Sequence, residues 1–159
     1  MIASFPPIVN NHSEILILGT MPGAMSLAKQ EYYGHKQNAF WKIMYSLFSQ
    51  LPVAEHFADK KQLLLENKIA VWDILAYCER KGSLDIHIKN QTENDIPELL
   101  RQFPKITKIL FNGKESYKYF HRKFGDMEGI SYHIMPSTSP ANTIKFDDKL
   151  HFWKQALIG

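Results

Sequence analysis

The chain has 159 residues, of which 45% are hydrophobic, so it is long enough to bury a sizeable core within one domain spanning residues 1–159. Its formal net charge of +3 is a mild basic excess that is compatible with a polyanionic partner. A single cysteine, Cys78, excludes an internal disulfide or an iron–sulfur cluster held by cysteines. The sequence has no run of about 18 apolar residues, so we expect a cytoplasmic protein with no membrane partner.

Strand-like and helix-like patterns alternate along most of the chain. In chain order they are an extended lead-in at 1–13, a strand at 14–18, a helix at 38–49, a helix at 57–66, a strand at 69–72, a helix at 92–103, a strand at 106–111, a helix that ends before Gly125, a strand at 131–135 and a helix at 147–157. Residues 76–90 show no clear period, so we expect a long loop there. Thr92 and Asp95 have the spacing of a capping box at the start of the third helix, with Asp in place of the usual Glu or Gln.

This alternation predicts an α/β fold, namely a three-layer α/β/α sandwich with a central, mostly parallel four-stranded sheet. In such a sheet the carboxyl ends of the strands share one edge, and ligands bind beyond that edge. The four expected strand exits are the turn 19–23, Asp73, the Asn112-Gly113 pair and the segment 136–142. Their convergence predicts a ligand site at this edge of the sheet.

Several common kinds of catalytic site are missing from the sequence. There is no Walker-type glycine-rich loop, which disfavours hydrolysis of nucleoside triphosphates. The seven histidines are scattered without an HExxH motif or a comparable ligand spacing. Ser137 and Ser139 lack the GxSxG arrangement of an activated serine nucleophile. We therefore expect a site that uses no metal and no other cofactor.

The strand exits and the loop after the first strand are rich in aromatic and neutral hydrogen-bonding side chains. They are Tyr32, Tyr33, His35, Gln37, Asn38, Asn112, Ser137, Thr138, Ser139 and Asn142. Such groups can hold a flat heterocycle by stacking and by amide contacts along its edge, and they can orient a water molecule. The serines, with Lys145 and Lys149, could grip backbone phosphates. Packing of the two tyrosines, and helix capping by Asn38, are open interpretations of the same residues.

Two motifs resemble those of the uracil-DNA glycosylase superfamily. The first is Gly19-Thr20-Met21-Pro22-Gly23 followed by Tyr33-Gly34-His35-Lys36-Gln37-Asn38-Ala39-Phe40-Trp41, and the second is Met135-Pro136-Ser137-Thr138-Ser139. The GxxPG turn, the aromatic-x-His-x-x-Asn-x-Phe-Trp segment and the MPS-type motif look like those of the mismatch-specific uracil and thymine glycosylases. Over nearly the whole chain, the sequence is most similar to the hypoxanthine (deoxyinosine) DNA glycosylase branch.

The resemblance implies an enzyme that flips a deaminated base out of DNA and hydrolyses its N-glycosidic bond, with hypoxanthine preferred and uracil or xanthine as further substrates. Mismatch-type members carry a water-activating Asn at the position of Met21. In the hypoxanthine branch this role is assigned to the Asn that corresponds to Asn38, so the resemblance implies that Asn38 is the catalytic residue. A neutral amide is adequate if the base departs early with a developing negative charge.

The same match suggests roles for further residues. Tyr33 would stack on the flipped base, Asp73 would accept from its N1–H and Asn112 would donate to its O6, while His35 would assist the leaving group or brace the loop. The backbone amides of the turn that comprises Gly19, Thr20, Met21, Pro22 and Gly23 would stabilise the anionic base. The DNA backbone and the gap in the duplex would meet Ser137, Thr138, Ser139, Pro140, Ala141, Asn142, Lys145 and Lys149, although Ala141, near the family's wedge position, is small.

Two alternatives are open. One is a mismatch-specific uracil or thymine-DNA glycosylase. The other is a non-catalytic DNA- or nucleotide-binding relative that lost the Asn at the position of Met21, in which Asn38 would only cap a helix. For the enzyme we expect a monomer whose partner is DNA that contains deaminated bases.

Overall fold

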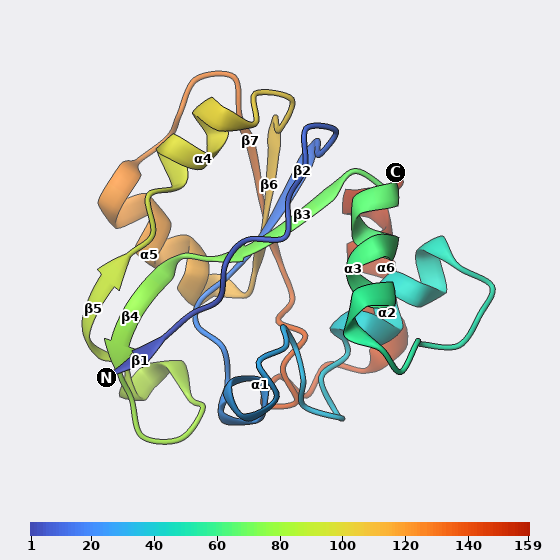
Figure 1. Ribbon diagram of the computed structural model, residues 1–159, viewed down its shortest axis with the longest axis horizontal. Helices are drawn as coiled ribbons and strands as arrows, with labels where there is room; N and C mark the ends of the chain where they lie inside the picture. The colour runs from blue at the N-terminus through green and yellow to red at the C-terminus, as the bar shows by residue number, and fades with distance from the viewer.

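The computed structural model describes all residues, 1–159, and is built around a four-stranded parallel sheet (Figure 1). The strands are β2 (Ile15–Gly19), β3 (Ile69–Asp73), β6 (Lys108–Asn112) and β7 (Ser131–Met135). Their order is β3-β2-β6-β7, and every neighbouring pair is parallel. The inner strands are short runs rich in branched apolar residues, which suit a sheet covered on both faces. The predicted α/β fold with four parallel strands is confirmed.

Helices cover both faces of this sheet and complete the three layers of the predicted sandwich (Figure 1). They are α1 (Ala24–Lys29), α2 (Phe40–Phe48), α3 (Phe57–Glu66), α4 (Ile96–Gln102), α5 (Lys114–Phe124) and α6 (Phe146–Leu157). The helices α2, α3 and α6 pack on one face, and α4 and α5 pack on the other. The helices predicted at 38–49, 57–66 and 147–157 are confirmed to within two residues.

Alternating side chains of the central strand β2 divide the core into two halves. Ile17 packs on the face of α2, α3 and α6, in a cluster that contains Phe40 and Trp153. Leu16 and Leu18 point to the opposite face, where their cluster includes Ile96 of α4 and Phe120 of α5. Since successive side chains of a strand point to opposite faces, a strand buried on both faces needs apolar residues at every position. This is why β2 reads as an unbroken apolar run rather than an alternating one.

The long loop expected at residues 76–90 is wrong at its two ends, because residues 76–79 and 89–90 lie in strands, whereas residues 80–88 between them form no strand. The strands β4 (Leu75–Glu79) and β5 (Lys89–Glu93) form an antiparallel hairpin with the 3-10 turn η1 (Asp85–His87) between them, and β1 (Ile2–Ala3) pairs with β4. Only Leu75 and Cys78 of the two hairpin strands are buried, so the sequence has no apolar alternation to reveal them. Backbone pairing, rather than side-chain burial, stabilises β5.

Other local differences are smaller. The loop expected after the first strand contains the short helix α1, in which only Ser26 is buried, so six residues carry no helical stripe of apolar side chains. The strand expected at 106–111 begins two residues later, at Lys108. Phe5 and Ile8 of the lead-in are buried against the body, as the sequence predicts.

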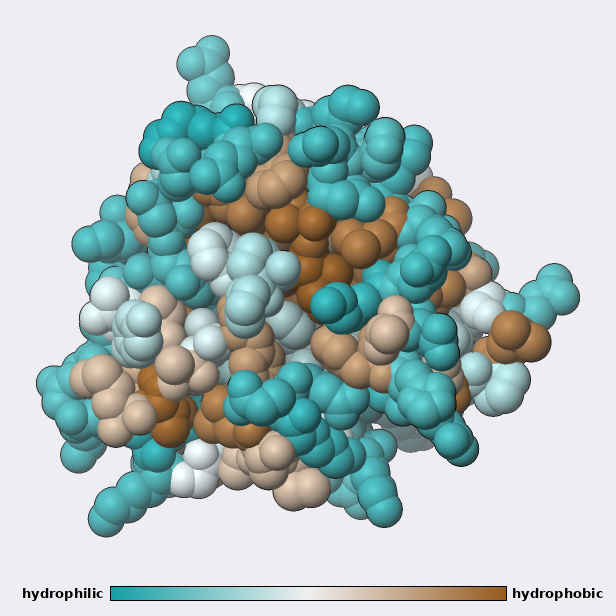
Figure 2. Space-filling model, viewed as in Figure 1, coloured by the Kyte–Doolittle hydropathy of each residue, from teal (hydrophilic) through white to brown (hydrophobic).

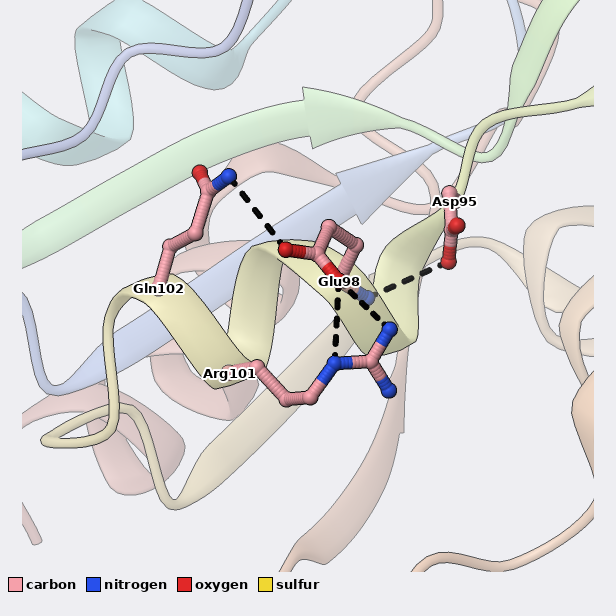
Figure 3. Close-up of polar contacts among 4 residues, drawn as sticks. All are labelled: Asp95, Glu98, Arg101 and Gln102. Carbon is pink, nitrogen blue, oxygen red and sulfur yellow. Dashed lines mark hydrogen bonds and ion pairs between the residues drawn. The ribbon is translucent and has the colours of Figure 1, made fainter.

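Asp95, and not Thr92, caps α4 (Figure 3). The Asp95 side chain accepts a hydrogen bond from the backbone N–H of Glu98 at 3.1 Å, and Arg101 Nε donates to the Glu98 carboxylate at 2.9 Å. Thr92 pairs with Tyr77 of β4 and therefore belongs to the hairpin. The predicted capping box is wrong, because the strand continues past Thr92 and the helix starts later.

The face of the molecule shown in Figure 2 is mostly hydrophilic, with a hydrophobic band across its middle. The two chain ends lie on opposite sides of the molecule, with the N-terminus beside the hairpin of β4 and β5 (Figure 1). None of the helices combines the length and the apolar character that crossing a membrane would require.

The substitution Asp95→Ala is expected to lower the free energy of unfolding by about 1 kcal/mol, because the backbone N–H of Glu98 loses its acceptor. Thr92→Ala is the matched control and is expected to change stability by less than about 0.5 kcal/mol, since Thr92 is exposed and caps nothing. Urea unfolding followed by circular dichroism measures both values. A larger loss for Thr92→Ala than for Asp95→Ala would contradict the assignment of the cap.

Candidate active site

The parallel register brings the carboxyl ends of the strands side by side. Gly19 of β2 pairs with Asp73 of β3, and Asn112 of β6 pairs with Met135 of β7. Neighbouring strands lie about 4.8 Å apart, so these residues form one row along the edge of the sheet. A cavity of about 650 Å³ opens at this row. Its size falls within the roughly 300–1,000 Å³ that is common for small-ligand sites.

Most of the residues predicted for the site line this cavity. They are Gly19, Thr20, Met21, Pro22, Gly23, Tyr33, His35, Asn38, Asp73, Asn112, Ser137, Thr138, Ser139, Pro140, Ala141 and Asn142. Lys145 and Lys149 do not line it. Four segments that are distant in the sequence therefore meet at one place, as the strand exits predict, while the role of each residue stays a prediction.

Asp73 is a buried carboxylate at the floor of the cavity, with 3% of its surface exposed. Its Oδ2 atom is buried and has no hydrogen-bond partner. The pKa of this carboxyl is raised to about 7, chiefly by burial and also by the negative charge of Asp85, while the positive charge of Arg80 opposes the shift. A buried polar atom without a partner is rare and is expected mainly at functional sites. Asp73 is thus available to accept a hydrogen bond from a ligand.

Gly19 allows Asp73 and Tyr33 to approach the backbone closely. A methyl group at Gly19 would stand 2.6 Å from Asp73 Oδ1 and 3.1 Å from the Tyr33 hydroxyl oxygen. Both distances are shorter than ordinary van der Waals contact, so the site leaves no room for a side chain here. The Tyr33 hydroxyl is itself buried without a partner. The carboxylate and the hydroxyl therefore face the same small region beside Gly19.

The ring of Tyr33 stacks on Phe40, with ring centroids 4.1 Å apart and planes inclined by 22°. This contact occupies one face of the ring, so at most one face is free to stack on a base. Tyr33 adopts a left-handed backbone conformation with φ of 53°, which turns the chain after the neighbouring Tyr32. Tyr32 is buried and its hydroxyl donates to the Pro6 carbonyl at 2.8 Å. Packing, which the sequence left open for both tyrosines, thus accounts for Tyr32.

Asn112 joins β6 to the segment that follows β7. Its side-chain Nδ2 donates to the Thr138 hydroxyl at 2.9 Å, and its Oδ1 accepts from the Thr138 backbone N–H at 2.9 Å. Both residues are buried. An amide nitrogen carries two hydrogens, so the bond to Thr138 leaves one N–H of Asn112, which faces the Tyr33 hydroxyl or a ligand. The pair holds the segment 136–142 against the cavity.

Asn38 lies on the cavity wall, just before α2. Its side-chain oxygen accepts a hydrogen bond from the backbone N–H of Phe40 at 2.9 Å, although Ala39 occupies the N-cap position itself. A carbonyl oxygen has two lone pairs, so this bond leaves one for a water molecule. Capping of the helix start and a place at the cavity wall are compatible in this residue.

His35 braces its own loop. Its Nδ1 accepts from the backbone N–H of Gln37 at 3.0 Å, and its carbonyl oxygen accepts from the backbone N–H of Asn38 at 2.9 Å. The side chain is exposed at the cavity rim. These contacts favour a structural role over assistance to a leaving group.

Lys149 is buried beneath the segment 137–142, with 4% of its surface exposed. Its ammonium group donates to the carbonyl oxygens of Asn142 at 2.9 Å and of Ser139 at 3.3 Å. Burial lowers the pKa of this amine. Ser139 also accepts from the backbone N–H of Ala141, so the segment is held from within. The phosphate contact predicted for Lys149 stays a prediction, and its burial weighs against it, whereas Lys145 is exposed.

Sequence reasoning missed the contribution of the hairpin tip to the cavity. Ser83, Leu84 and Asp85 line it, and Ser83 Oγ accepts from the backbone N–H of Ala24 at 2.9 Å. Arg80 donates to the Pro22 carbonyl oxygen and thereby ties the hairpin to the turn after β2. The charged residues Arg80 and Asp85 were the available signal for a site in this stretch. Because the hairpin was not predicted, the sequence did not connect them to the turn after the first strand.

The chain matches known proteins over nearly its whole length. A model of the uracil DNA glycosylase superfamily matches residues 6–157. A hypoxanthine DNA glycosylase of Methanosarcina barkeri is 33% identical to this chain, over 96% of this chain and 95% of the relative. A hypoxanthine DNA glycosylase of Methanosarcina acetivorans is also 33% identical, over 87% of this chain and 86% of the relative. The solution NMR structure of a proposed uracil DNA glycosylase from Methanosarcina acetivorans superposes with a TM-score of 0.82 at 30% identity and covers 98% of this chain and 95% of its own.

The substitution Asp73→Asn is expected to stabilise the protein at neutral and alkaline pH. The pKa of the folded carboxyl is about 7 against an ordinary value of 3.8, so the folded state binds more protons and loses stability as the pH rises between these values. The stability gained by the variant should therefore grow from about pH 4 to about pH 7, to on the order of a few kcal/mol, and then level off. Urea unfolding across this range measures it.

The exposed Asp147→Asn is the control, since this carboxyl on α6 stays in water. A gain for Asp73→Asn that is the same at every pH would show that the Asp73 carboxyl does not carry the shifted titration.

Proposed function

Because this chain belongs to the uracil DNA glycosylase superfamily and is a DNA glycosylase, which hydrolyses the N-glycosidic bond of a base in DNA, we propose that its preferred target is hypoxanthine. The two Methanosarcina relatives named hypoxanthine DNA glycosylase support this choice of base. The proposal includes flipping of the nucleotide, since the bond is inaccessible in a stacked duplex, and release leaves an abasic site.

The observation that carries the proposal is the unpartnered Asp73 oxygen beside groups that can donate. Hypoxanthine presents an N–H at N1 next to a carbonyl at C6. Asp73 in its ionised form can accept from N1–H, and the free N–H of Asn112 or the Tyr33 hydroxyl can donate to O6. Such an arrangement reads a ring N–H next to a carbonyl.

This pattern separates hypoxanthine and uracil from adenine and cytosine, the bases from which they derive, whereas xanthine and its parent guanine share the N1–H and the C6 carbonyl. Adenine presents an unprotonated ring nitrogen next to an amino group. At the same site its ring nitrogen, an acceptor, would face the acceptor Asp73, and its amino group, a donor, would face the donor Asn112 or Tyr33. A buried site with such mismatches rejects the wrong ligand strongly, because polar groups are left unpaired. Uracil and xanthine carry the same N–H and carbonyl pair as hypoxanthine, which makes them the natural further substrates.

For the hydrolysis step we assign the water-orienting role to Asn38. Its side-chain oxygen keeps a lone pair after it accepts from the Phe40 N–H. Asn38 lines the same cavity as Asp73. The corresponding position in the turn, Met21, has 8% of its surface exposed and packs in the core cluster below α4 and α5. A thioether there cannot orient a water molecule, since it has no strong acceptor or donor.

The chemistry requires a water molecule near the sugar and stabilisation of the departing base. The bond to the base breaks toward an oxocarbenium-like sugar, and the base accumulates negative charge. Preorganised donors stabilise such charge most effectively in a site that excludes water. The backbone amides of the turn 19–23 and the donor near O6 serve this purpose in the proposed mechanism, while His35 keeps the loop in place.

Three finer points belong to the same proposal. The segment 136–142 would contact the backbone and the gap left in the duplex, with Ser137 and Ser139 as phosphate contacts. The protein would act on DNA as a monomer in the cytoplasm. A preference for uracil would instead place it with the mismatch-specific enzymes of the superfamily.

The substitution Asn38→Ala is expected to slow base release by at least about 100-fold in single-turnover assays, because the water loses its orienting group. Binding of uncleaved duplex is expected to change little. Asn10→Ala is the matched control, since Asn10 also accepts a hydrogen bond two residues ahead, from His12 N–H at 2.9 Å, but is remote from the cavity. Full activity of Asn38→Ala would transfer the role to another group.

The choice of base is tested with otherwise identical duplexes that contain inosine, uracil or xanthosine opposite the same partner. Alkali-labile strand breaks measure release of each base. We expect the inosine duplex to be cut at least as fast as the uracil duplex. We expect Asp73→Asn to lower the rate on inosine more than tenfold, because the amide replaces one acceptor oxygen of the carboxylate with an NH2 donor, which would oppose the N–H of the base. A clear preference of the wild type for uracil would overturn the proposed substrate.

A further inference from the structure

A second cavity adjoins the candidate active site on the other side of the loop before α2. Its volume is about 620 Å³. It shares Tyr33, His35 and Asn38 with the first cavity and continues along α2 to the segment 49–53 and to α3. The two cavities thus have one wall in common, and that wall carries the residue proposed to orient the water.

The second cavity is strongly basic. Its lining includes Lys29, Lys36, Lys42 and Lys60 and contains no aspartate or glutamate. We refer to it as the lysine cavity. The ion pairs that lysine and arginine make in this structure involve other residues, namely Lys68, Arg101 and Lys118. Four positive charges therefore surround one hollow without a carboxylate partner, and their mutual repulsion favours an anionic ligand there.

Two of the four amines are held at the cavity by contacts that do not neutralise them. Lys29 Nζ donates to the Gly34 carbonyl oxygen at 2.9 Å, and Lys60 Nζ lies 5.7 Å from the centre of the Trp41 ring; both Gly34 and Trp41 line the cavity. Lys42 Nζ lies 4.3 Å from the centre of the Phe146 ring, which does not line it. An ammonium group has three hydrogens, so each amine retains donors for an anion. These contacts reduce the entropy lost when a ligand is bound.

The first cavity has the opposite charge balance. Asp73, Asp85 and Glu115 line it, and Lys114 is its one lysine or arginine. Lys149, on α6 beneath the segment after β7, is buried, and its ammonium group already donates to the carbonyl oxygens of Ser139 and Asn142. A polyanion whose base enters this cavity needs cations elsewhere, and the lysine cavity is the adjoining place that supplies them.

We propose that the lysine cavity binds the sugar–phosphate backbone of the DNA strand that carries the target base, next to the flipped nucleotide. Ser46, Ser49 and Gln50 also line it and can donate to phosphate oxygens. The ligand is backbone rather than a second base, since the aromatic rings away from the shared wall, Trp41 and Tyr45, have only 5% and 7% of their surface exposed and offer little stacking area. This inference rests on the proposed function for the identity of the strand.

The test is the salt dependence of binding to an undamaged duplex, which needs no base release. For the double variant Lys36→Gln and Lys42→Gln, the slope of log Kd against log salt concentration is expected to fall by about 1 for each lysine removed. The matched control is the double variant Lys105→Gln and Lys123→Gln, which removes two exposed lysines remote from both cavities and should keep the wild-type slope. Thermal unfolding of both double variants verifies that they fold.

A second measurement separates this proposal from the proposed function. In single-turnover release of hypoxanthine, the enzyme concentration needed for half-maximal rate should rise in the Lys36 and Lys42 variant and stay at the wild-type value in the Lys105 and Lys123 variant. A reduced slope in a protein that releases no hypoxanthine would retain the lysine cavity and reject the substrate. A wild-type slope in that variant would overturn the lysine cavity as a backbone site, whatever the activity.

Discussion

The parallel register across β2 is the constraint on which the site depends. Hydrogen bonding of β2 to β3 on one side and to β6 on the other places Gly19 between Asp73 and Asn112. A slip of one residue would turn every side chain of a strand to the opposite face, so Ile17 would leave the cluster of Phe40 and Trp153 for the cluster that holds Leu16 and Leu18. The packing of the two cores therefore fixes the register, and the register fixes which three residues meet at the edge.

The same arrangement explains how a carboxylate can lie unpaired at the cavity floor. Asp73 is buried beside Gly19, where no side chain separates it from Tyr33. Leaving its Oδ2 without a partner destabilises the folded state, and the raised pKa expresses that cost. Natural proteins keep such groups chiefly where a ligand supplies the missing hydrogen bond. In the proposed function the base supplies it, so the destabilised group becomes the recognition element.

Much of this could be predicted because the sheet is made of apolar runs followed by polar exits. The strands β2 and β3 and the convergence of their exits follow from that pattern, since burial on both faces leaves a clear signal, whereas the edge strand β7 has no fully buried residue. The hairpin of β4 and β5 could not be found in the same way, because β5 reads KNQTE and is stabilised by pairing with β4. Its tip therefore stayed unconnected to the site, and so did Arg80 and Asp85. The lysine cavity could not be predicted either, since its four lysines are spread over 32 positions and come together only through the packing of α1, the loop after it, α2 and α3.

The common wall of the two cavities links the proposed chemistry to the proposed binding of the strand. If a base occupies the first cavity and the neighbouring backbone lies in the lysine cavity, the sugar that joins them would lie beside the shared wall of Tyr33, His35 and Asn38. A water held by Asn38 at that wall would lie near the sugar, whereas Met21 packs in a core cluster and offers no strong donor or acceptor. The start of α2 is therefore the position from which a single amide can serve both the helix and the hydrolysis, because its oxygen accepts from Phe40 N–H and has a second lone pair.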